Sequence, residues 1–131
     1  MKFKLKLVAP SDRPYWVKWS RFLLLLRPQD LDDLNAEVIY PYLNGLWFYK
    51  TANDPILFAP ATIYIEDGHA FFVNGRHRCL LLSQYADEVP MAFTHIQPGN
   101  EVILTQIVSR PIAPDEEVEL PDLQIRGRFR S

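Results

Sequence analysis

The sequence is poor in the residues that build disulfides and metal centres. Among its 131 residues there are one cysteine, Cys79, and three histidines, His69, His77 and His95. A single cysteine excludes an internal disulfide and is typical of a reducing compartment. No His/Cys spacing matches a structural zinc site, so we predict no metal site built from protein ligands. A Mg²⁺ ion held by phosphates and one carboxylate stays open, because such sites need few protein ligands.

Long apolar runs are absent as well. The longest, residues 22–26, is far shorter than the roughly 20 apolar residues that span a bilayer. Residues 1–8 alternate basic and apolar side chains, whereas a signal peptide would separate them into a basic start and an apolar block. The alternation predicts a half-buried strand. We therefore expect a soluble, cytoplasmic protein without membrane insertion.

Neither sign of charge is in large excess. The chain carries 14 Lys and Arg against 16 Asp and Glu, which gives a net charge of −2. The chain as a whole is therefore not an electrostatic nucleic-acid binder, and any contact with nucleic acid must come from a local patch. The apolar content of 48% is enough for the core of one domain.

The composition changes after Ser109. Prolines interrupt an acidic stretch, residues 115–119, and the chain ends with Arg126, Arg128 and Arg130. We therefore predict a single domain over residues 1–109 and an extended tail, first acidic and then basic, over residues 110–131. We expect this tail to be solvated, and attraction of a basic partner is the alternative.

The first half of the chain contains two ambiguous segments. Residues 15–26 fit both strand and helix spacing, and a strand that leads into a short helix is one solution. Asp30 is placed to cap a helix that runs through Ile39. This helix overlaps a hairpin predicted around Asn44-Gly45, so an earlier helix end, near Asn35, is the alternative.

The second half has a clearer order of elements. Residues 63–65 and 70–73 flank a turn and predict a second hairpin, followed by a helix over residues 75–86 and a strand over residues 89–96. Residues 101–108 fit either a helix capped by Asn100 or a β-branched strand. The expected fold class is α+β (mixed α/β), with a small mixed sheet and a few packed helices.

The candidate site lies between the second hairpin and its helix, at Asn74-Gly75-Arg76-His77-Arg78. This order places three cationic or titratable side chains in the first turn of a helix, where free N–H groups and the helix dipole attract anions. Arginines are disfavoured at that end unless an anion completes the site, so the sequence predicts bound phosphate. A turn with solvated arginines is the alternative.

Each residue of this turn has an expected role. Gly75 allows close backbone approach or a positive φ, and Asn74 can bond a ligand but cannot act as a base. Arg76 adds a phosphate contact, and Arg78 can hold a phosphate bidentately. His77 can donate a hydrogen bond and transfer a proton, so His77 and Arg78 are the candidate catalytic residues. Cys79, one residue further, should point away from the site.

The hairpin, the Gly-x-His-Arg turn, the helix and the Val89-Pro90 strand together resemble the ParB/sulfiredoxin superfamily, which includes ParB-like nucleases. The resemblance covers about residues 55–96 and implies that His77 and Arg78 grip a phosphate. Sulfiredoxins carry their reactive cysteine at the position of Arg76, so the resemblance does not extend to sulfiredoxin chemistry. Many relatives also have an acidic residue where this chain has Asn74.

The aromatic and basic residues 15–25 resemble the start of the small plasmid fertility inhibition factors, which share this fold. That resemblance implies suppression of conjugative DNA transfer, ATPase or DNase activity, a nucleotide such as ATP with Mg²⁺, and a conjugation or type IV secretion component as partner. The alternative is a non-catalytic inhibitor. It would use the Trp16 and Trp19 region, or the acidic tail, to bind a transfer, secretion or toxin-type partner.

Overall fold

The computed structural model describes residues 1–131 and has an α+β fold. Its largest sheet has five strands in the order β7-β6-β8-β2-β9. Only β6 and β8 pair in parallel, and the other neighbours are antiparallel. The strands are β2 (Arg13–Lys18), β6 (Ala61–Glu66), β7 (His69–Asn74), β8 (Glu88–Phe93) and β9 (Val108–Pro111).

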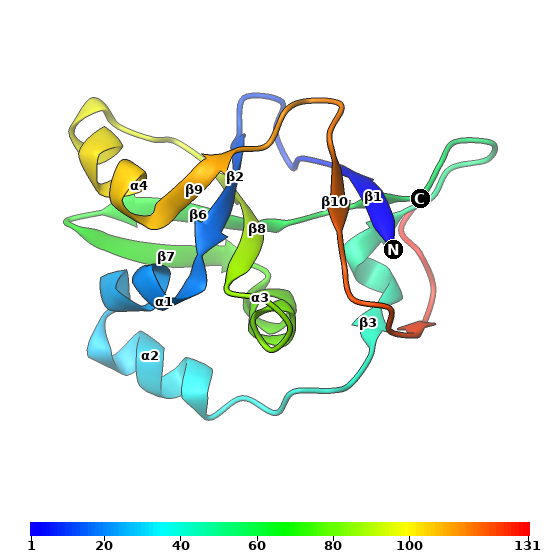
Figure 1. The fold of residues 1–131 in the computed structure, drawn as a ribbon, viewed down its shortest axis with the longest axis horizontal. Helices are drawn as coiled ribbons and strands as arrows, with labels where there is room; N and C mark the ends of the chain where they lie inside the picture. The colour runs from blue at the N-terminus through cyan, green and yellow to red at the C-terminus, as the bar shows by residue number, and fades with distance from the viewer.

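Two smaller sheets bring the ends of the chain together. A four-stranded sheet has the order β10-β1-β5-β4, and a two-stranded sheet pairs β11 with β3 in parallel. Figure 1 shows β1 and β10 side by side, although they come from opposite ends of the chain. The strands are β1 (Lys2–Leu5), β3 (Leu43–Asn44), β4 (Phe48–Tyr49), β5 (Leu57–Phe58), β10 (Glu117–Glu119) and β11 (Ile125–Arg126).

Four short α-helices and three 3₁₀ turns complete the fold. Helix α3 packs against β8 and β6, and the chain after α2 runs past α3 on its way to β3 (Figure 1). None of these helices is long and apolar enough to cross a bilayer. They are α1 (Trp19–Phe22), η1 (Leu23–Leu25), α2 (Pro28–Asn35), η2 (Gly45–Trp47), α3 (Arg76–Ser83), η3 (Pro98–Asn100) and α4 (Glu101–Ile107).

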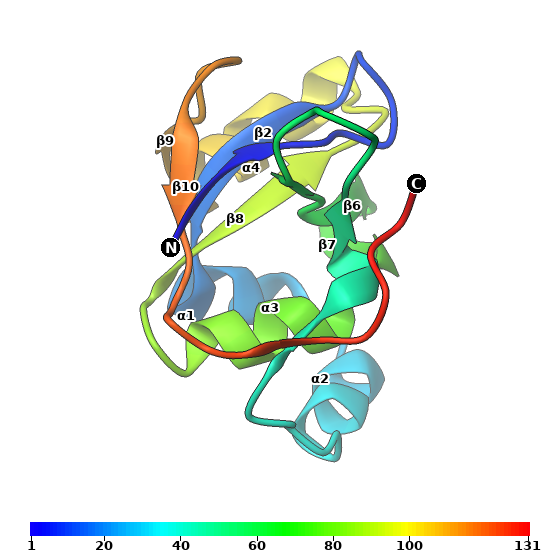
Figure 2. The ribbon, with the colours of Figure 1, turned by 90° about the vertical axis from the view of Figure 1, so that its right-hand side faces the viewer.

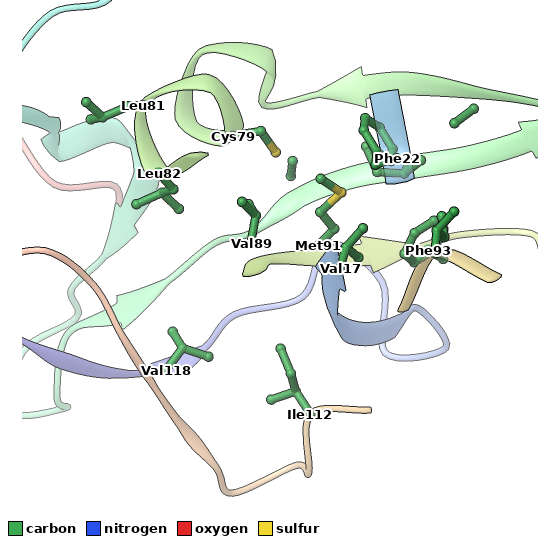
Figure 3. Close-up of a cluster of buried hydrophobic side chains, with 14 of the residues drawn as sticks. Val17, Phe22, Cys79, Leu81, Leu82, Val89, Met91, Phe93, Ile112 and Val118 are labelled. Carbon is green, nitrogen blue, oxygen red and sulfur yellow. The ribbon is translucent and has the colours of Figure 1, made fainter. Parts of the chain in front are cut away.

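Apolar side chains build the core between α3 and the large sheet. Val17, Met91 and Phe93 of the sheet are buried, and Cys79 points from α3 into this cluster (Figure 3). The expectation for Cys79 is confirmed, since its side chain lies in the core. Burial raises the pKa of the Cys79 thiol to about 12, so it stays protonated and unreactive at neutral pH.

The predicted elements of the second half are confirmed. Strands β6 and β7 form the expected hairpin, α3 follows at Arg76, and β8 returns as the next strand. Residues 15–26 contain the end of β2 followed by α1 and η1, which is the strand-to-helix solution. Residues 101–107 form a helix, but Asn100 does not cap it, because its side-chain amide donates instead to the carbonyl of Ile65 at 3.0 Å.

The hairpin predicted at Asn44-Gly45 is wrong. Asn44 accepts a hydrogen bond from the backbone N–H of Leu46 at 2.9 Å and starts the 3₁₀ turn η2. A Cβ on Gly45 would lie 2.5 Å from the carbonyl oxygen of Gly127, so the glycine makes room for the C-terminal segment. The helix expected in this region forms as α2 and ends at Asn35, the earlier of its two predicted ends, but it begins at Pro28, so Asp30 lies inside its first turn and does not cap it.

Residues 110–131, expected as a tail, are built into the fold. β10 pairs with β1, and Val118 and Leu120 are buried in the main core. The alternation Glu117-Val118-Glu119 explains this placement, because successive side chains of a strand face opposite sides. In Figure 2 the segment after β10 passes alongside α3 before the chain ends.

Candidate functional site

The turn between β7 and α3 needs a glycine for two separate reasons. Gly75 has a φ of 88°, in the left-handed region that residues with a side chain rarely adopt. A Cβ at this position would also lie 2.5 Å from the Cβ of Ala61. Asn74, just before it, accepts a hydrogen bond from the backbone N–H of Thr62 at 3.1 Å, which ties the end of β7 to β6. The start of α3 is therefore fixed against the sheet.

Two of the three predicted cations at the helix start meet a carboxylate of the same chain. Arg76 Nε lies 2.7 Å from Oε1 of Glu37, and His77 Nδ1 lies 3.0 Å from Oε2. The Glu37 side chain is only 9% exposed, whereas Arg76 and His77 are 45% and 63% exposed. The anion that the sequence predicts at this helix start is thus supplied, in this structure, by Glu37.

The Glu37 contacts are short but poorly directed. Neither carboxylate oxygen accepts a hydrogen bond of good geometry, although both lie within ion-pair distance of a cation. Glu37 follows α2 in an irregular segment, and its backbone N–H bonds to the carbonyl of Leu34 at 3.2 Å. Charge rather than aligned hydrogen bonding therefore holds this carboxylate at the helix start.

Arg78 points to a different place from Arg76 and His77. Its Nη1 donates to the carbonyl of Ala59 at 2.6 Å, and its guanidinium lies 6.0 Å from the ring centre of Trp47. No carboxylate lies within ion-pair distance, and the buried Nε has no hydrogen-bond partner. Burial lowers the pKa of Arg78, and the nearby charge of Arg130 lowers it further. Arg78 thus braces the connection between β5 and β6 in this structure.

A groove of about 240 Å³ opens beside His77. Part of its lining belongs to α3 and part to residues 38–42, which follow Glu37 in the chain, and Trp47 of η2 also lines it. The lining is mostly apolar and includes three aromatic rings, those of Tyr40, Tyr42 and Trp47. Because His77 contacts Glu37 and also lines the groove, the cationic helix start and the groove form one continuous site.

Sequence reasoning missed Glu37 and the aromatic wall. The sequence predicts that residues 36–42 are shared between a helix and a hairpin, and neither element would bring Glu37 to the start of α3. In the structure Val38 and Tyr40 are 65% and 58% exposed.

Other candidate residues lie away from this site. Glu66 and Asp67 form the tip of the β6–β7 hairpin, at the opposite end from Gly75, and Asp67 has the φ of 51° typical of a turn. The proposed docking residues Trp16 and Trp19 are half-buried against the core, and Trp16 Nε1 donates to Glu116. They do not form an exposed aromatic surface.

The residues at the helix start do not fit a protein-held Mg²⁺ ion. No group of three or more His, Cys, Asp or Glu side chains is placed to bind a metal. Glu37 is the one carboxylate in contact with the helix start, and its oxygens face the guanidinium of Arg76 and the imidazole of His77. A cation at the same oxygens would be repelled by Arg76.

His77 is the side chain best placed for proton transfer. Its Nδ1 lies 3.0 Å from Oε2 of Glu37 without an aligned hydrogen bond, and the imidazole is 63% exposed. Arg76 adds a permanent positive charge beside it. The arrangement can bind an anion, and it can give or take a proton at its edge.

Comparisons of the chain with protein-family models, with curated proteins and with solved structures found no match. The functional argument therefore depends on the site itself.

Proposed function

We propose that this protein binds a phosphate group of a nucleotide or nucleic acid at the start of α3, and that it suppresses conjugative DNA transfer in the cytoplasm. The second part follows the resemblance to the small plasmid fertility inhibition factors. The observation that supports phosphate binding is that the partly exposed side chains of Arg76 and His77 meet only a carboxylate that accepts no aligned hydrogen bond from them. Such a carboxylate can be exchanged for a ligand anion.

A phosphate has more charge and more acceptor oxygens than Glu37. It could accept aligned hydrogen bonds from Arg76 and His77 together with the free backbone N–H groups of the first turn of α3. Binding would then move residues 36–42 away from the helix start. This exchange explains why two cations stand at a helix end where the dipole disfavours them.

Hydrolysis of the bound phosphate is the catalytic version of this proposal. Arg76 would stabilise the charge that develops on the phosphoryl oxygens, and His77 Nε2 would accept a proton from the attacking water. Arg78 would keep the turn in place through Ala59 and Trp47. The family resemblance implies such ATPase or DNase activity, and a Mg²⁺ ion would have to arrive bound to the nucleotide.

Isothermal titration with ATP, CTP and a short DNA duplex tests the binding step. We expect Arg76→Ala to weaken phosphate binding about tenfold, because one charge-assisted contact contributes roughly 1.5 kcal/mol. Arg13→Ala is the matched control, because Arg13 pairs with Glu101 at 2.8 Å and is similarly exposed. If the wild-type protein binds none of the three ligands, the proposal is wrong for them.

A conjugation assay tests the biological step. Donor cells that express the wild-type protein should transfer a compatible plasmid less often than cells with an empty vector. Arg76→Ala should restore transfer if phosphate binding is required, and Arg13→Ala should not.

A second function is supported by the same contacts. Glu37 neutralises the helix start, and the exposed Val38, Ile39 and Tyr40 beside it could bind a protein of the transfer or secretion machinery. In this case the protein is a non-catalytic inhibitor. A double variant, Arg76→Ala with His77→Ala, would still suppress transfer, whereas Val38→Asp with Tyr40→Asp would not.

A further inference from the structure

We infer that the groove beside His77 binds an acidic segment of a partner protein, which inserts apolar side chains into the groove. The inference rests on the non-catalytic function proposed above and adds the chemistry of the partner. Three properties of the protein support it: an exposed apolar lining, arginines around it that have no acidic partner, and a neighbouring segment with a free backbone.

Exposed apolar side chains gather around this groove. Four of the nine large apolar residues that the fold leaves exposed lie here, each 40% to 65% exposed: Val38, Ile39, Tyr40 and Leu46. The first three line the groove, and Leu46 precedes the lining residue Trp47. Single exposed apolar residues are normal, whereas a group of them around a concave surface is typical of a protein-binding site.

The segment that forms one side of the groove has a free backbone. Residues 38–42 belong to no helix or strand, and none of their N–H or C=O groups bonds to another main-chain group. Regular bonding resumes at Leu43, whose N–H donates to the carbonyl of Gln124 at 2.9 Å. The main chain of a partner can therefore bond to residues 38–42 while its side chains enter the groove.

Arginines surround the groove without acidic partners. Two of them lie over lining rings, Arg126 at 4.8 Å from the ring centre of Tyr42 and Arg78 at 6.0 Å from that of Trp47. Arg130 donates to the carbonyl of the residue before Trp47 at 2.6 Å. None of these three guanidinium groups lies within ion-pair distance of a carboxylate. No acidic residue lines the groove, so the complementary partner is acidic.

The acidic residues that precede the groove in the chain are mostly engaged elsewhere. Glu37 meets Arg76 and His77 at the start of α3. Asp30 and Asp33 bind side chains at the N-terminal end of α2. The positive charge of the three arginines therefore stays available to a partner.

The groove suits the side chains of a protein better than the bases of a nucleic acid. Its volume of about 240 Å³ is below the roughly 300–1,000 Å³ of pockets that enclose drug-sized ligands, so it takes one or two apolar side chains. Of its three rings only Tyr40 is exposed, since Arg126 and Arg78 lie over the other two. Sites for single strands offer successive open rings along a basic groove.

Selection from a phage library of random dodecapeptides tests the chemistry of the partner. Wild-type protein should enrich peptides that combine several Asp or Glu residues with large apolar residues. The most enriched peptide, labelled with a fluorophore, is then titrated with each variant by fluorescence anisotropy. Circular dichroism of each variant confirms that it folds.

Tyr40→Ala tests the apolar part of the groove. We expect it to weaken binding of the enriched peptide at least about tenfold, as loss of a central contact does. Tyr40→Phe, which keeps the ring, should bind like the wild-type protein. Tyr85→Ala is the matched control, because Tyr85 is 53% exposed, close to the value for Tyr40, and lines a different cavity next to residues 119–122.

Arg126→Ala tests the charge. Its loss should weaken binding about twofold to fivefold at low salt. The difference from the wild-type protein should vanish near 1 M salt, where the screening length is only about 3 Å. Arg21→Ala is the control, because Arg21 is also exposed and bonds to one uncharged oxygen, the carbonyl of Gln106 at 3.3 Å, but does not line the groove.

Several results would overturn the inference. These are the absence of any enriched peptide, enriched peptides without net negative charge, and binding that is unchanged in Tyr40→Ala. Self-association in sedimentation that is lost in Tyr40→Ala would assign the groove to a second copy of the chain. A single-stranded octanucleotide that binds more tightly than the peptide and depends on Tyr40 would assign it to nucleic acid. Both assignments overturn the acidic protein partner.

The conjugation assay separates this inference from the inhibitor function. If Val38→Asp with Tyr40→Asp abolishes suppression but no acidic peptide is enriched, the inhibitor function stands and the acidic partner is overturned. If acidic peptides depend on Tyr40 but the double variant still suppresses transfer, the docking site is supported and the inhibitor function is overturned.

Discussion

Two glutamates of this protein face an arginine and a ring nitrogen, and they do so in different ways. Glu116 accepts hydrogen bonds from Nη1 and Nη2 of Arg110 at 2.9 and 2.7 Å, from the backbone N–H of Ala113 at 3.1 Å and from Nε1 of Trp16 at 3.3 Å. Glu37 lies 2.7 Å from Arg76 and 3.0 Å from His77 but accepts no hydrogen bond of good geometry from either.

The difference shows which of the two carboxylates is structural. The hydrogen bond from Arg110, followed by those from Ala113 and Trp16, lowers the pKa of Glu116 to about 2. Glu116 therefore fixes the loop between β9 and β10. Glu37 holds its place by charge alone, so another anion can replace it. Four predictions test this contrast, beginning with the largest expected effect.

The start of α3 is the part of the Glu37 site most sensitive to substitution. Gly75→Ala must both adopt a positive φ and place a methyl group against Ala61. We expect a loss of about 2–4 kcal/mol in the free energy of unfolding, measured by urea denaturation.

Gly68→Ala is the control, because Gly68 has a φ of 77° but nothing within 4 Å of the added Cβ. It should cost only the backbone strain, about 1 kcal/mol. Equal losses in both variants would contradict the close packing on Ala61.

Replacing each glutamate by glutamine should show how much Glu116 and Glu37 each contribute to the stability of the fold. Glu116→Gln disturbs both hydrogen bonds from Arg110 and should lower the Tm by a few degrees. Glu37→Gln removes a charge that makes no aligned hydrogen bond, and its partners Arg76 and His77 can turn to solvent, so the change in unfolding free energy should stay within about 1 kcal/mol. Differential scanning calorimetry at neutral pH measures both. A larger loss for Glu37→Gln than for Glu116→Gln would show that Glu37 is the structural carboxylate.

The stability that Glu116 contributes should depend on pH in the acid range. Its pKa is lowered from 4.5 to about 2 on folding, so the charged carboxylate stabilises the folded state at any pH above about 4.5. That stabilisation is lost as the pH falls through the folded-state pKa near 2, where the group is protonated in both states. The Tm difference between the wild-type protein and Glu116→Gln should therefore be constant above pH 4.5 and shrink toward pH 2. A difference that grows on acidification would contradict the lowered pKa.

The sequence predicts the site only where the information is local. The β6–β7 hairpin, Gly75 and the first turn of α3 are consecutive, so turn and helix patterns locate them. Glu37 meets Arg76 only because the chain after α2 passes α3, and no pattern in residues 30–50 indicates this path. Arg78 belongs to the same first turn, yet its direction depends on the carbonyl of Ala59. Sequence reasoning therefore finds the cations and not their partners.

For the fold, too, local patterns predict single elements, whereas contacts between distant parts of the chain are not predicted. Periodicity predicts β8 and the α+β class, because those signals lie within single elements. Gly45 resembles a hairpin glycine, but it serves the close approach of Gly127 from the other end of the chain. Composition likewise marks residues 110–131 as a tail, whereas pairing with β1 makes the segment a strand. Long-range contacts of this kind leave no local signal.

The smallest expected effect tests the exchange of Glu37 most directly. If the carboxylate competes with phosphate for Arg76 and His77, removing its charge should raise the affinity of the helix start for ATP and for tripolyphosphate. The competing ion pair is partly exposed and worth at most about 1 kcal/mol, which corresponds to about a fivefold gain in affinity.

Titration calorimetry of Glu37→Gln measures this gain, and Glu66→Gln is the control. Glu66 is an exposed carboxylate at the distant hairpin tip, and its variant changes the net charge equally. A gain in Glu37→Gln alone supports local competition, because a general charge effect would raise both. Weaker binding in Glu37→Gln would mean that Glu37 orients His77 for the ligand instead of occupying its place.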